Sequence, residues 1–325
     1  MQNYNQKYLK YKSKYLALKK QLSEISFITN LTGGYKTKKQ VSKSHLFKNL
    51  VGGYKTYIDA LSEIYESFKD ENETKSIEHS VDLLQDVLEK NHVSPCHGIE
   101  HAKIVMYHAF NALEDYPDIS QEDKLAVLLA ALLHDADDGK FFPDNHNYEN
   151  LRRVLADNGK SPAFIDKVAY MVSIVSASKN GDTIPDDVRG KEWMLIPRYA
   201  DRLEAIGLIG IERCLTYSLP RMPLFISTTP RPTTEEEIWS FATEERYSQY
   251  ATGKKSESMI DHYYDKLLRL SIFPIRNTYF DAECKVRRGP LIKFLIWFGK
   301  KDEITQADVE SFIKENKVHV SYSNE

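Results

Sequence analysis

Cysteine is scarce in this sequence, and long apolar runs are missing from it. Three cysteines occur among the 325 residues, at positions 96, 214 and 284, too far apart to form a metal-binding pair or a disulfide framework. This scarcity is typical of a reducing compartment, so we expect an intracellular, cytoplasmic protein. No apolar run approaches the roughly 18 residues of a membrane helix, and no signal-peptide pattern is present. A membrane protein and a secreted disulfide-rich protein are therefore not expected.

Strand-like alternation of apolar and polar residues is also rare, whereas helical spacing recurs along the chain. Residues 57–68 and 76–90, for example, each place their apolar side chains on one face of a helix. The composition, with 42% hydrophobic and 28% charged residues, is that of a globular protein. We therefore predict an all-α fold.

The small net charge of −3 conceals an uneven distribution of lysine. Residues 1–56 contain twelve lysines, no arginine and one acid, Glu24, so they carry +11 and the rest of the chain carries −14. Such asymmetry marks an appendage. We predict a basic N-terminal helix and Gly-rich linker over residues 1–56, and a helical core over residues 57–325. The basic part could dock on its own domain, on a partner protein or on a polyanion.

One stretch carries the strongest chemical signal. Nine apolar residues, 125–133, predict a helix buried on nearly all sides, and His134 and Asp135 follow at its C-terminal end. A charged side chain at the end of a buried helix is costly unless something compensates it, and the usual compensation is a metal ion. One imidazole and one carboxylate side by side suit Mn, Fe or Zn better than an all-oxygen calcium site.

Two ligands do not hold a catalytic ion, so the chain should supply more of them. Upstream, the segment HGIEH places His97 and His101 four residues apart and therefore on one helical face. Downstream, Asp201 lies in the first turn of another apolar helix, where the helix dipole favours a carboxylate. Gly207 and Gly210, which follow in the same stretch, would permit close helix packing.

Four segments together resemble the HD-domain metal-dependent phosphohydrolases, in particular the small bacterial subgroup. They span roughly residues 90 to 272 and read HGIEHAKIV, LLAALLHDADDGK, PRYADRLEAIGLIGIERCL and SESMIDHYYDKLLRL. The resemblance implies an HD-domain helical bundle with additional flanking helices. It also implies one divalent ion, with Mn favoured over Mg, Fe, Ni and Zn, held by His101, His134, Asp135 and Asp201. The opening helix and Gly-Gly segments are similar to the N-termini of large amoeba-virus proteins, which would place the protein in a virion or host cytoplasm.

The resemblance also suggests residues for catalysis and substrate binding. Asp138 matches the position of an acid that positions or deprotonates a water, although a solvent-exposed turn carboxylate is the alternative. Lys140 could meet a phosphate oxygen. His97 could be a further ligand, a substrate contact or a partner of a ligand. Arg202 could also pair with Glu204. The candidate substrate contacts are His97, His146, Lys179, Arg202 and Lys255.

Three functions follow from these patterns. The first is a phosphohydrolase that acts on a nucleotide or another small phosphate ester through a mononuclear site. The second is a cyclic-nucleotide phosphodiesterase, which is disfavoured because His146 alone lies where two-metal relatives carry further histidines. The third is a virion or nucleic-acid-associated protein with a vestigial HD site. The proline-rich stretch between residues 217 and 255 is either a lid over the site or surface decoration.

Overall fold

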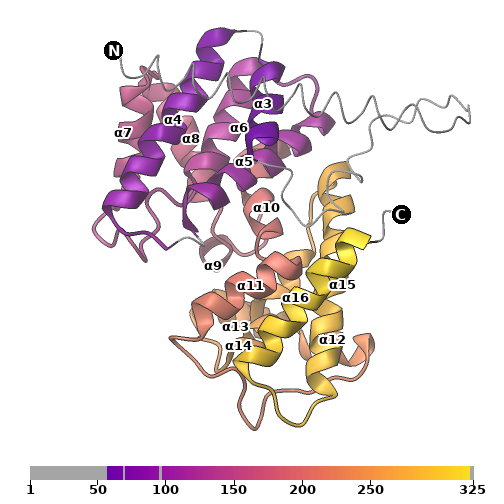
Figure 1. Cartoon of the computed structure of the whole chain (residues 1–325). Coiled ribbons are helices and arrows are strands. Elements are labelled where there is room, and N and C mark those ends of the chain that lie inside the picture. Colours follow the sequence, from indigo (N-terminus) through magenta and orange to yellow (C-terminus); the bar gives the residue numbers. More distant parts are fainter. Residues whose placement is uncertain (1–56, 69, 95–96, 323–325) are drawn as a thin grey trace, which may run out of the picture. The chain divides into compact units, whose positions relative to one another are not determined.

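Helices make up the structure, a computed structural model that describes residues 57–68, 70–94 and 97–322 (Figure 1). No strand occurs within these ranges, so the predicted all-α fold is confirmed. The basic segment 1–56, with its predicted helix and Gly-rich linker, lies outside the described residues. None of the described helices combines the length and the apolar content that crossing a membrane requires.

Helix α6 (Gln121–Leu133) is the central element of a first group of helices. Ser120 caps it by accepting a hydrogen bond from the Asp123 amide at 3.1 Å. Every residue from Leu125 to Leu133 is buried, as the sequence predicts. The surrounding helices supply the apolar partners that bury α6. This first group also contains α3 (Tyr57–Ser67), α4 (Glu71–Lys90), α5 (Ile99–Ala112), α7 (Glu149–Asp157) and α8 (Pro162–Ser173).

The second group of helices is built around one long helix. Helices α11 and α12 pack on α15, and α16 packs on α11. A single turn of π-helix over Tyr263–Leu267 continues directly from α14. The group consists of α11 (Gly207–Ser218), α12 (Glu235–Phe241), α13 (Glu244–Ala251), α14 (Met259–His262), α15 (Thr278–Gly299) and α16 (Gln306–Tyr322), with the short α9 (Ala177–Asn180) against α13.

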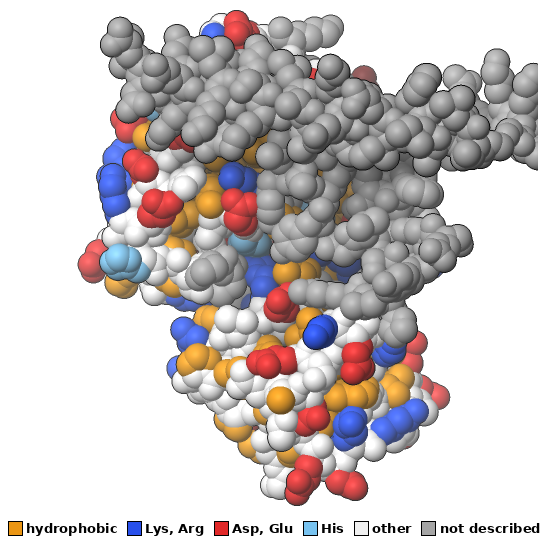
Figure 2. Space-filling model, in the orientation of Figure 1, with side chains coloured by type: hydrophobic (Ala, Val, Ile, Leu, Met, Phe, Trp, Pro, Cys, Tyr) orange, Lys and Arg blue, Asp and Glu red, His pale blue; other side chains and the backbone are white. Residues whose placement is uncertain are grey.

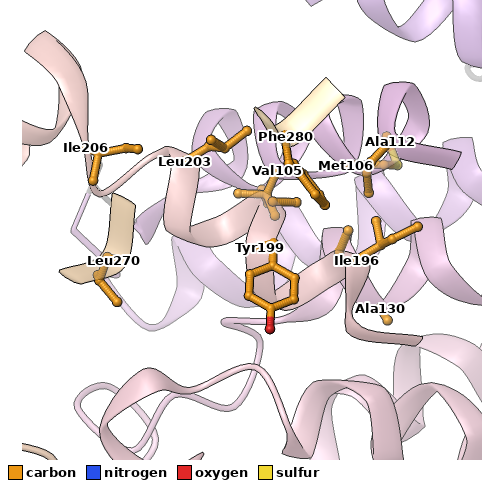
Figure 3. Packing of buried hydrophobic residues seen from close by; sticks show 14 of the residues in the cluster. Val105, Met106, Ala112, Ala130, Ile196, Tyr199, Leu203, Ile206, Leu270 and Phe280 are labelled. Carbon is orange, nitrogen blue, oxygen red and sulfur yellow. The ribbon is translucent and has the colours of Figure 1, made fainter. Parts of the chain in front are cut away.

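Helix α10 (Ile196–Leu203) joins the two groups (Figure 1). It contacts α5 and α6 on one side and α15 on the other. Tyr199 and Leu203 are fully buried here, close to Val105 of α5 and Phe280 of α15 (Figure 3). Because each fully buried apolar side chain contributes about 1.5–3 kcal/mol, these contacts hold α10 firmly in place. Its polar residues, Asp201 among them, are therefore fixed relative to both groups.

The proline-rich segment over residues 219–234 is tied to the second group. The Arg231 guanidinium donates a hydrogen bond to the Lys301 carbonyl oxygen just beyond α15. Gly299 of α15 lets the backbone of Pro232 approach the helix closely, because a Cβ atom at position 299 would overlap the Pro232 carbonyl oxygen. The segment is therefore a packed connection between helices rather than a free lid.

Candidate metal centre

Four side chains from three helical segments converge where the sequence predicts the metal site. His101 lies on α5, His134 and Asp135 follow α6 directly, and Asp201 lies on α10. His101 Nε2 is 3.4 Å from Asp201 Oδ1 and 3.8 Å from Asp135 Oδ2. His134 Nε2 is 3.5 Å and 3.3 Å from the same two oxygens. These residues meet because α10 packs against both α5 and α6.

The spacing of these donor atoms fits a divalent cation. Ligands held about 2.1 Å from one ion lie about 3.0–3.4 Å apart at right-angled or tetrahedral positions. The four separations, from 3.3 to 3.8 Å, are close to that range. The imidazoles of His101 and His134 are 4% and 1% exposed, whereas the side chains of Asp135 and Asp201 keep 17% and 33%. The carboxylates therefore lie nearer the solvent, where a substrate can reach them.

The surroundings of His134 make Nε2 its ligand atom. Its Nδ1 lies 2.8 Å from the Ala131 carbonyl oxygen, which can only accept, so Nδ1 carries a proton and donates it. Nε2 is buried between the carboxylates of Asp135 and Asp201, at 3.3 Å and 3.5 Å. Burial acts to lower the pKa of His134, but these two carboxylates outweigh it and raise that pKa well above its usual value. A divalent ion bound between the same groups would take the place of the Nε2 proton.

The Nε2 atom of His101 also faces the carboxylates, and the guanidinium of Arg213 contacts it. Arg213 Nη2 lies 3.3 Å from His101 Nε2. A guanidinium only donates, so this contact favours a lone pair on Nε2, whereas the Asp201 carboxylate, 3.4 Å away, favours a proton there. Nδ1 is buried without a hydrogen-bond partner. Burial lowers the pKa of His101 to about 4, and the charge of Arg213 adds to this effect. The imidazole is therefore neutral at physiological pH, which is the form that binds a metal.

Both carboxylates are ionised. Burial acts to raise the pKa of Asp135, but the imidazoles of His134 and His97 outweigh it and hold that pKa well below the usual value. The pKa of Asp201 is also well below its usual value, because His101 and His134 outweigh burial. In the protein without an ion the positive charge of His134 offsets these two carboxylates, and a divalent ion would offset them in its place.

His97 joins the cluster from the start of the segment that leads into α5. Its Nδ1 is 2.7 Å from Asp135 Oδ2, and its side chain is 16% exposed. Its ligand atom, with those of His101 and Asp135, forms a second group that could hold an ion. Because this group shares His101 with the group of His101, His134 and Asp201, the described residues form one cluster rather than two separate sites. The contact favours His97 as a ligand or a ligand's partner over a substrate contact.

Asp138 and Lys140 lie together in the turn after α6. The Asp138 carboxylate accepts hydrogen bonds from the Lys140 amide at 2.9 Å and from Lys140 Nζ at 3.2 Å. Lys140 Nζ also lies 5.7 Å from the centre of the Tyr217 ring. The Asp138 backbone amide donates to the Asp135 carbonyl oxygen at 3.2 Å. Among the described contacts, none joins the Asp138 carboxylate to the side chains of the four candidate ligands, so a role for that carboxylate requires a bridging water or substrate.

The other predicted substrate contacts lie apart from this cluster. His146, Lys179 and Lys255 are exposed. The His146 backbone amide donates to Glu149, which orders its own loop. Within the described part of the chain, no contact links these three side chains to the candidate ligands, because each lies in a loop or short helix that turns toward solvent.

Arg202 does not pair with Glu204, contrary to the expectation from the sequence. Its guanidinium donates to Asp182 and to the Gly181 carbonyl oxygen, both at 2.5 Å, and is almost fully buried. Glu204 instead meets Arg287 at 3.0 Å, from α15. Arg202 and Glu204 leave α10 in different directions, so Arg202 holds the loop after α9 and Glu204 faces the second group of helices.

Sequence reasoning missed two cations near the site, Arg213 on α11 and Lys266 on the π-helix. Both lie inside segments that carry the family resemblance, but Arg213 alone is the single base of a largely apolar helix, since Lys266 has His262 and Arg269 within four residues. That isolation is the signal that could have singled out Arg213, because a base on an apolar face needs a local partner.

Comparison with known proteins gives one relative from an amoeba virus. No family model matches the chain. Over 224 residues the chain is 40% identical to uncharacterized protein L803 of Acanthamoeba polyphaga mimivirus, which covers 64% of this chain and 90% of that protein. The chain belongs to the same family as this mimivirus protein. A relative from an amoeba virus agrees with the resemblance of the N-terminal sequence to large amoeba-virus proteins.

Two solved structures from bacteria are similar to this chain in fold. A crystal structure from Lactobacillus plantarum has a TM-score of 0.51 and 22% identity, and it covers 69% of this chain and 95% of that chain. An HD-superfamily hydrolase from Bacillus thuringiensis has a TM-score of 0.47 and 20% identity, over 70% and 97% of the two chains. The likeness to the Lactobacillus plantarum structure shows a shared fold, which in this chain is the all-α helical bundle predicted from the sequence.

Proposed function

We propose that this protein is a divalent-metal-dependent phosphohydrolase of the HD type that acts on a nucleotide or another small phosphate ester. One observation carries the proposal. Two buried imidazoles direct Nε2 toward two ionised carboxylates, at separations that suit one ion. Such a donor set holds a cation and leaves positions free on the side of the carboxylates.

The proposed ligands are His101, His134, Asp135 and Asp201. Their mixed nitrogen and oxygen donors suit Mn best among the candidate metals, with Mg, Fe, Ni and Zn as alternatives. When bound, a divalent ion lowers the pKa of a water and neutralises phosphate oxygens. A mononuclear site is favoured, because the two possible ligand groups of the described residues share His101.

The chain's own residues would orient the reactants and move the proton. Asp138 would accept the proton of the attacking water at its carboxylate, which Lys140 holds in place at 3.2 Å. The Lys140 ammonium would then face the phosphate oxygens as a point charge. His97 would fix the orientation of Asp135 through its 2.7 Å contact.

A screen of metals against substrates tests this function. The purified chain would be loaded with each candidate metal and offered mono-, di- and triphosphates of nucleosides together with cyclic dinucleotides. We expect hydrolysis of the linear phosphates with Mn and no hydrolysis by Asp135→Ala. Equal turnover by the wild type and Asp135→Ala, or no turnover with any metal, would contradict the proposal, and cleavage confined to cyclic dinucleotides would favour the phosphodiesterase.

The basic segment 1–56 supports a second candidate, a nucleic-acid-associated protein with a vestigial site. Twelve lysines in a short segment would bind a polyanion through counterion release. DNA binding that weakens steeply with salt and disappears on deletion of residues 1–56, together with a chain that hydrolyses nothing, would favour this candidate.

A further inference from the structure

A cavity of about 830 Å³ lies along one face of α15. The residues that α15 contributes to its lining run from Asp281 to Ile296 at alternating spacings of three and one, which places them on one side of the helix. Arg287 lies on the opposite side and reaches Glu204 of α10 at 3.0 Å. Because a helix with its side chains is about 10 Å thick, α15 separates this cavity from α10 and its candidate ligand Asp201.

The other walls of the cavity come from two further parts of the second group of helices. Ser271, Ile272 and Phe273 contribute from the segment that follows the π-helix, and Glu235 contributes from the start of α12. Small-molecule sites in proteins typically enclose roughly 300–1,000 Å³, so the volume is that of a binding site. The cavity is therefore large enough for a small organic molecule.

Gly289 leaves part of this space open. It lines the cavity in the interior of α15, and a Cβ atom there would meet no atom within 4 Å. Glycine inside a helix is less favourable than alanine, because it loses more backbone freedom on folding. Neither a left-handed backbone nor a packing contact requires glycine at this position. A larger side chain at position 289 would instead enter the cavity.

Apolar side chains form a second feature of the lining. Phe273, Ile292 and Ile296 line the cavity, and so does Ile272, which is 42% exposed. Large apolar side chains with this degree of exposure are rare among the described residues. Covering such a side chain with the apolar part of a ligand removes its surface from water, which is favourable.

The charged groups of the lining carry an excess of positive charge. Three basic and two acidic residues contribute, namely Lys285, Arg288, Lys293, Asp281 and Glu235. Arg288 donates from Nε and Nη2 to Ser271, at 3.1 and 2.6 Å, and no described residue pairs with its Nη1. Lys293 donates to Asn316, whereas Lys285 is exposed and forms no ion pair with a described residue. Arg288 and Lys285 are therefore available to an anionic group.

We propose that this cavity binds a small amphipathic organic anion, with its anionic group against Arg288 and Lys285 and its apolar part against Phe273 and Ile292. An apolar surface next to an excess of cations complements such a molecule in both respects. Residues 1–56 carry +11, so their charge is opposite to that of the proposed ligand. The site lies across α15 from the metal centre, so its ligand need not be a substrate.

Fluorescence titration of the full-length protein with anilinonaphthalene sulfonate, an aromatic body with one sulfonate, tests the site. We expect Gly289→Leu to bind the probe at least about tenfold more weakly than the wild type, because the leucine side chain fills the cavity. Gly289→Ala is the matched control and should bind within about threefold, since a Cβ alone meets nothing there. Both variants should melt no lower than the wild type, because both residues favour a helix more than glycine does.

Displacement of the probe by decanoate and by decyltrimethylammonium, both below their micelle concentrations, tests the charge. We expect decanoate to displace it from the wild type at least about tenfold more effectively, and Lys285→Met to reduce this preference at least about threefold. Lys300→Met is the control, because Lys300 is an exposed lysine outside the lining, and it should keep the preference.

Three outcomes would overturn the proposal. The first is equal affinity of the wild type and folded Gly289→Leu for the probe. The second is equal displacement of the probe by decanoate and decyltrimethylammonium. The third is probe binding that occurs only after deletion of residues 1–56, which would make that segment the occupant of the cavity.

Discussion

At the scale of single residues, the two histidines of the metal centre owe their ligand form to their neighbours. The Ala131 carbonyl oxygen fixes the proton of His134 on Nδ1. Arg213 meets Nε2 of His101, and burial keeps that imidazole neutral. Both side chains thus direct Nε2 toward Asp201, whose carboxylate oxygen lies 3.4 and 3.5 Å away. Asp201 is therefore the residue whose removal should disturb the site most directly.

Replacing Asp201 by Asn should weaken Mn binding by at least about tenfold and abolish hydrolysis, because it removes one anionic donor and leaves Asp135 alone. Titration of the purified variant with Mn, followed by electron paramagnetic resonance, measures the affinity. Asp201 is one-third exposed, so the variant should stay folded. An unchanged Mn affinity would exclude Asp201 as a ligand.

Replacing Asp138 by Asn should leave the affinity for Mn nearly unchanged and slow the hydrolysis. The Asp138 carboxylate contacts Lys140 rather than the side chains of the four candidate ligands, and Asn keeps the backbone amide that donates to the Asp135 carbonyl oxygen, so Mn affinity should stay within about threefold. If the carboxylate accepts the proton of the attacking water, turnover should fall by about 10²–10⁴-fold. Parallel Mn titration and steady-state kinetics test both parts, and full activity of Asp138→Asn would leave the carboxylate as an ordinary turn residue.

At the scale of helices, α10 is positioned by an ion-pair network on α15. Arg287 donates to Glu204 at 3.0 Å, to the Leu203 carbonyl oxygen at 2.8 Å and to Glu283 at 2.8 Å. His108 of α5 also meets Glu204, at 3.1 Å. Burial acts to raise the pKa of Glu204, but His108 and Arg287 outweigh it, so the pKa is lowered and the carboxylate is charged. The end of α10 is thus tied to both groups of helices.

Replacing Arg287 by Met should destabilise the protein by about 3–5 kcal/mol, because it leaves two buried carboxylates without their cation. Urea unfolding followed by circular dichroism measures the difference. Arg189→Ala is the control, since its pair with Asp186 is exposed, and it should change stability by less than about 0.5 kcal/mol. Similar unfolding free energies for Arg287→Met and Arg189→Ala would show that the network adds no stability.

At the scale of the whole molecule, charge is distributed unevenly along the chain. Residues 1–56 carry +11, and the remainder carries −14. On the face shown in Figure 2, acidic and basic side chains are interspersed over the described helices. The core residues that the structure describes all lie between Ile64 and Ile313. The basic segment is therefore expected to contribute binding rather than stability.

Deleting residues 1–56 should leave the melting temperature within about 3 °C of the wild type, because the deletion removes none of the described core. The same deletion should abolish salt-dependent binding to DNA or heparin, since it removes twelve lysines. Thermal melting and binding titrations at two salt concentrations measure the two effects. A deletion variant that fails to fold would show that the basic segment belongs to the core.

Local sequence patterns predicted where several helices begin, and α4 begins earlier than predicted. The sequence predicts a helix from residue 76, but α4 begins at Glu71 because the Asp70 side chain caps it by accepting from the Asn72 amide. The apolar pattern of that first turn is weak, so periodicity missed it. The prediction of close helix packing agrees with the structure at Gly207, where a Cβ would lie 3.2 Å from the Arg287 Cβ of α15, whereas a Cβ on Gly210 would meet the Ala205 carbonyl oxygen of the preceding turn.

The sequence by itself determined that this chain is helical, because periodicity is local, and its resemblance to a family proposed His101, His134, Asp135 and Asp201 as ligands. Tertiary structure alone decided which charged groups accompany them. Arg213 contacts His101 at 3.3 Å, while Lys255 is exposed to solvent. Periodicity tells which face of its own helix a side chain occupies, but the packing of α10 against α5, α6 and α15 decides which faces meet.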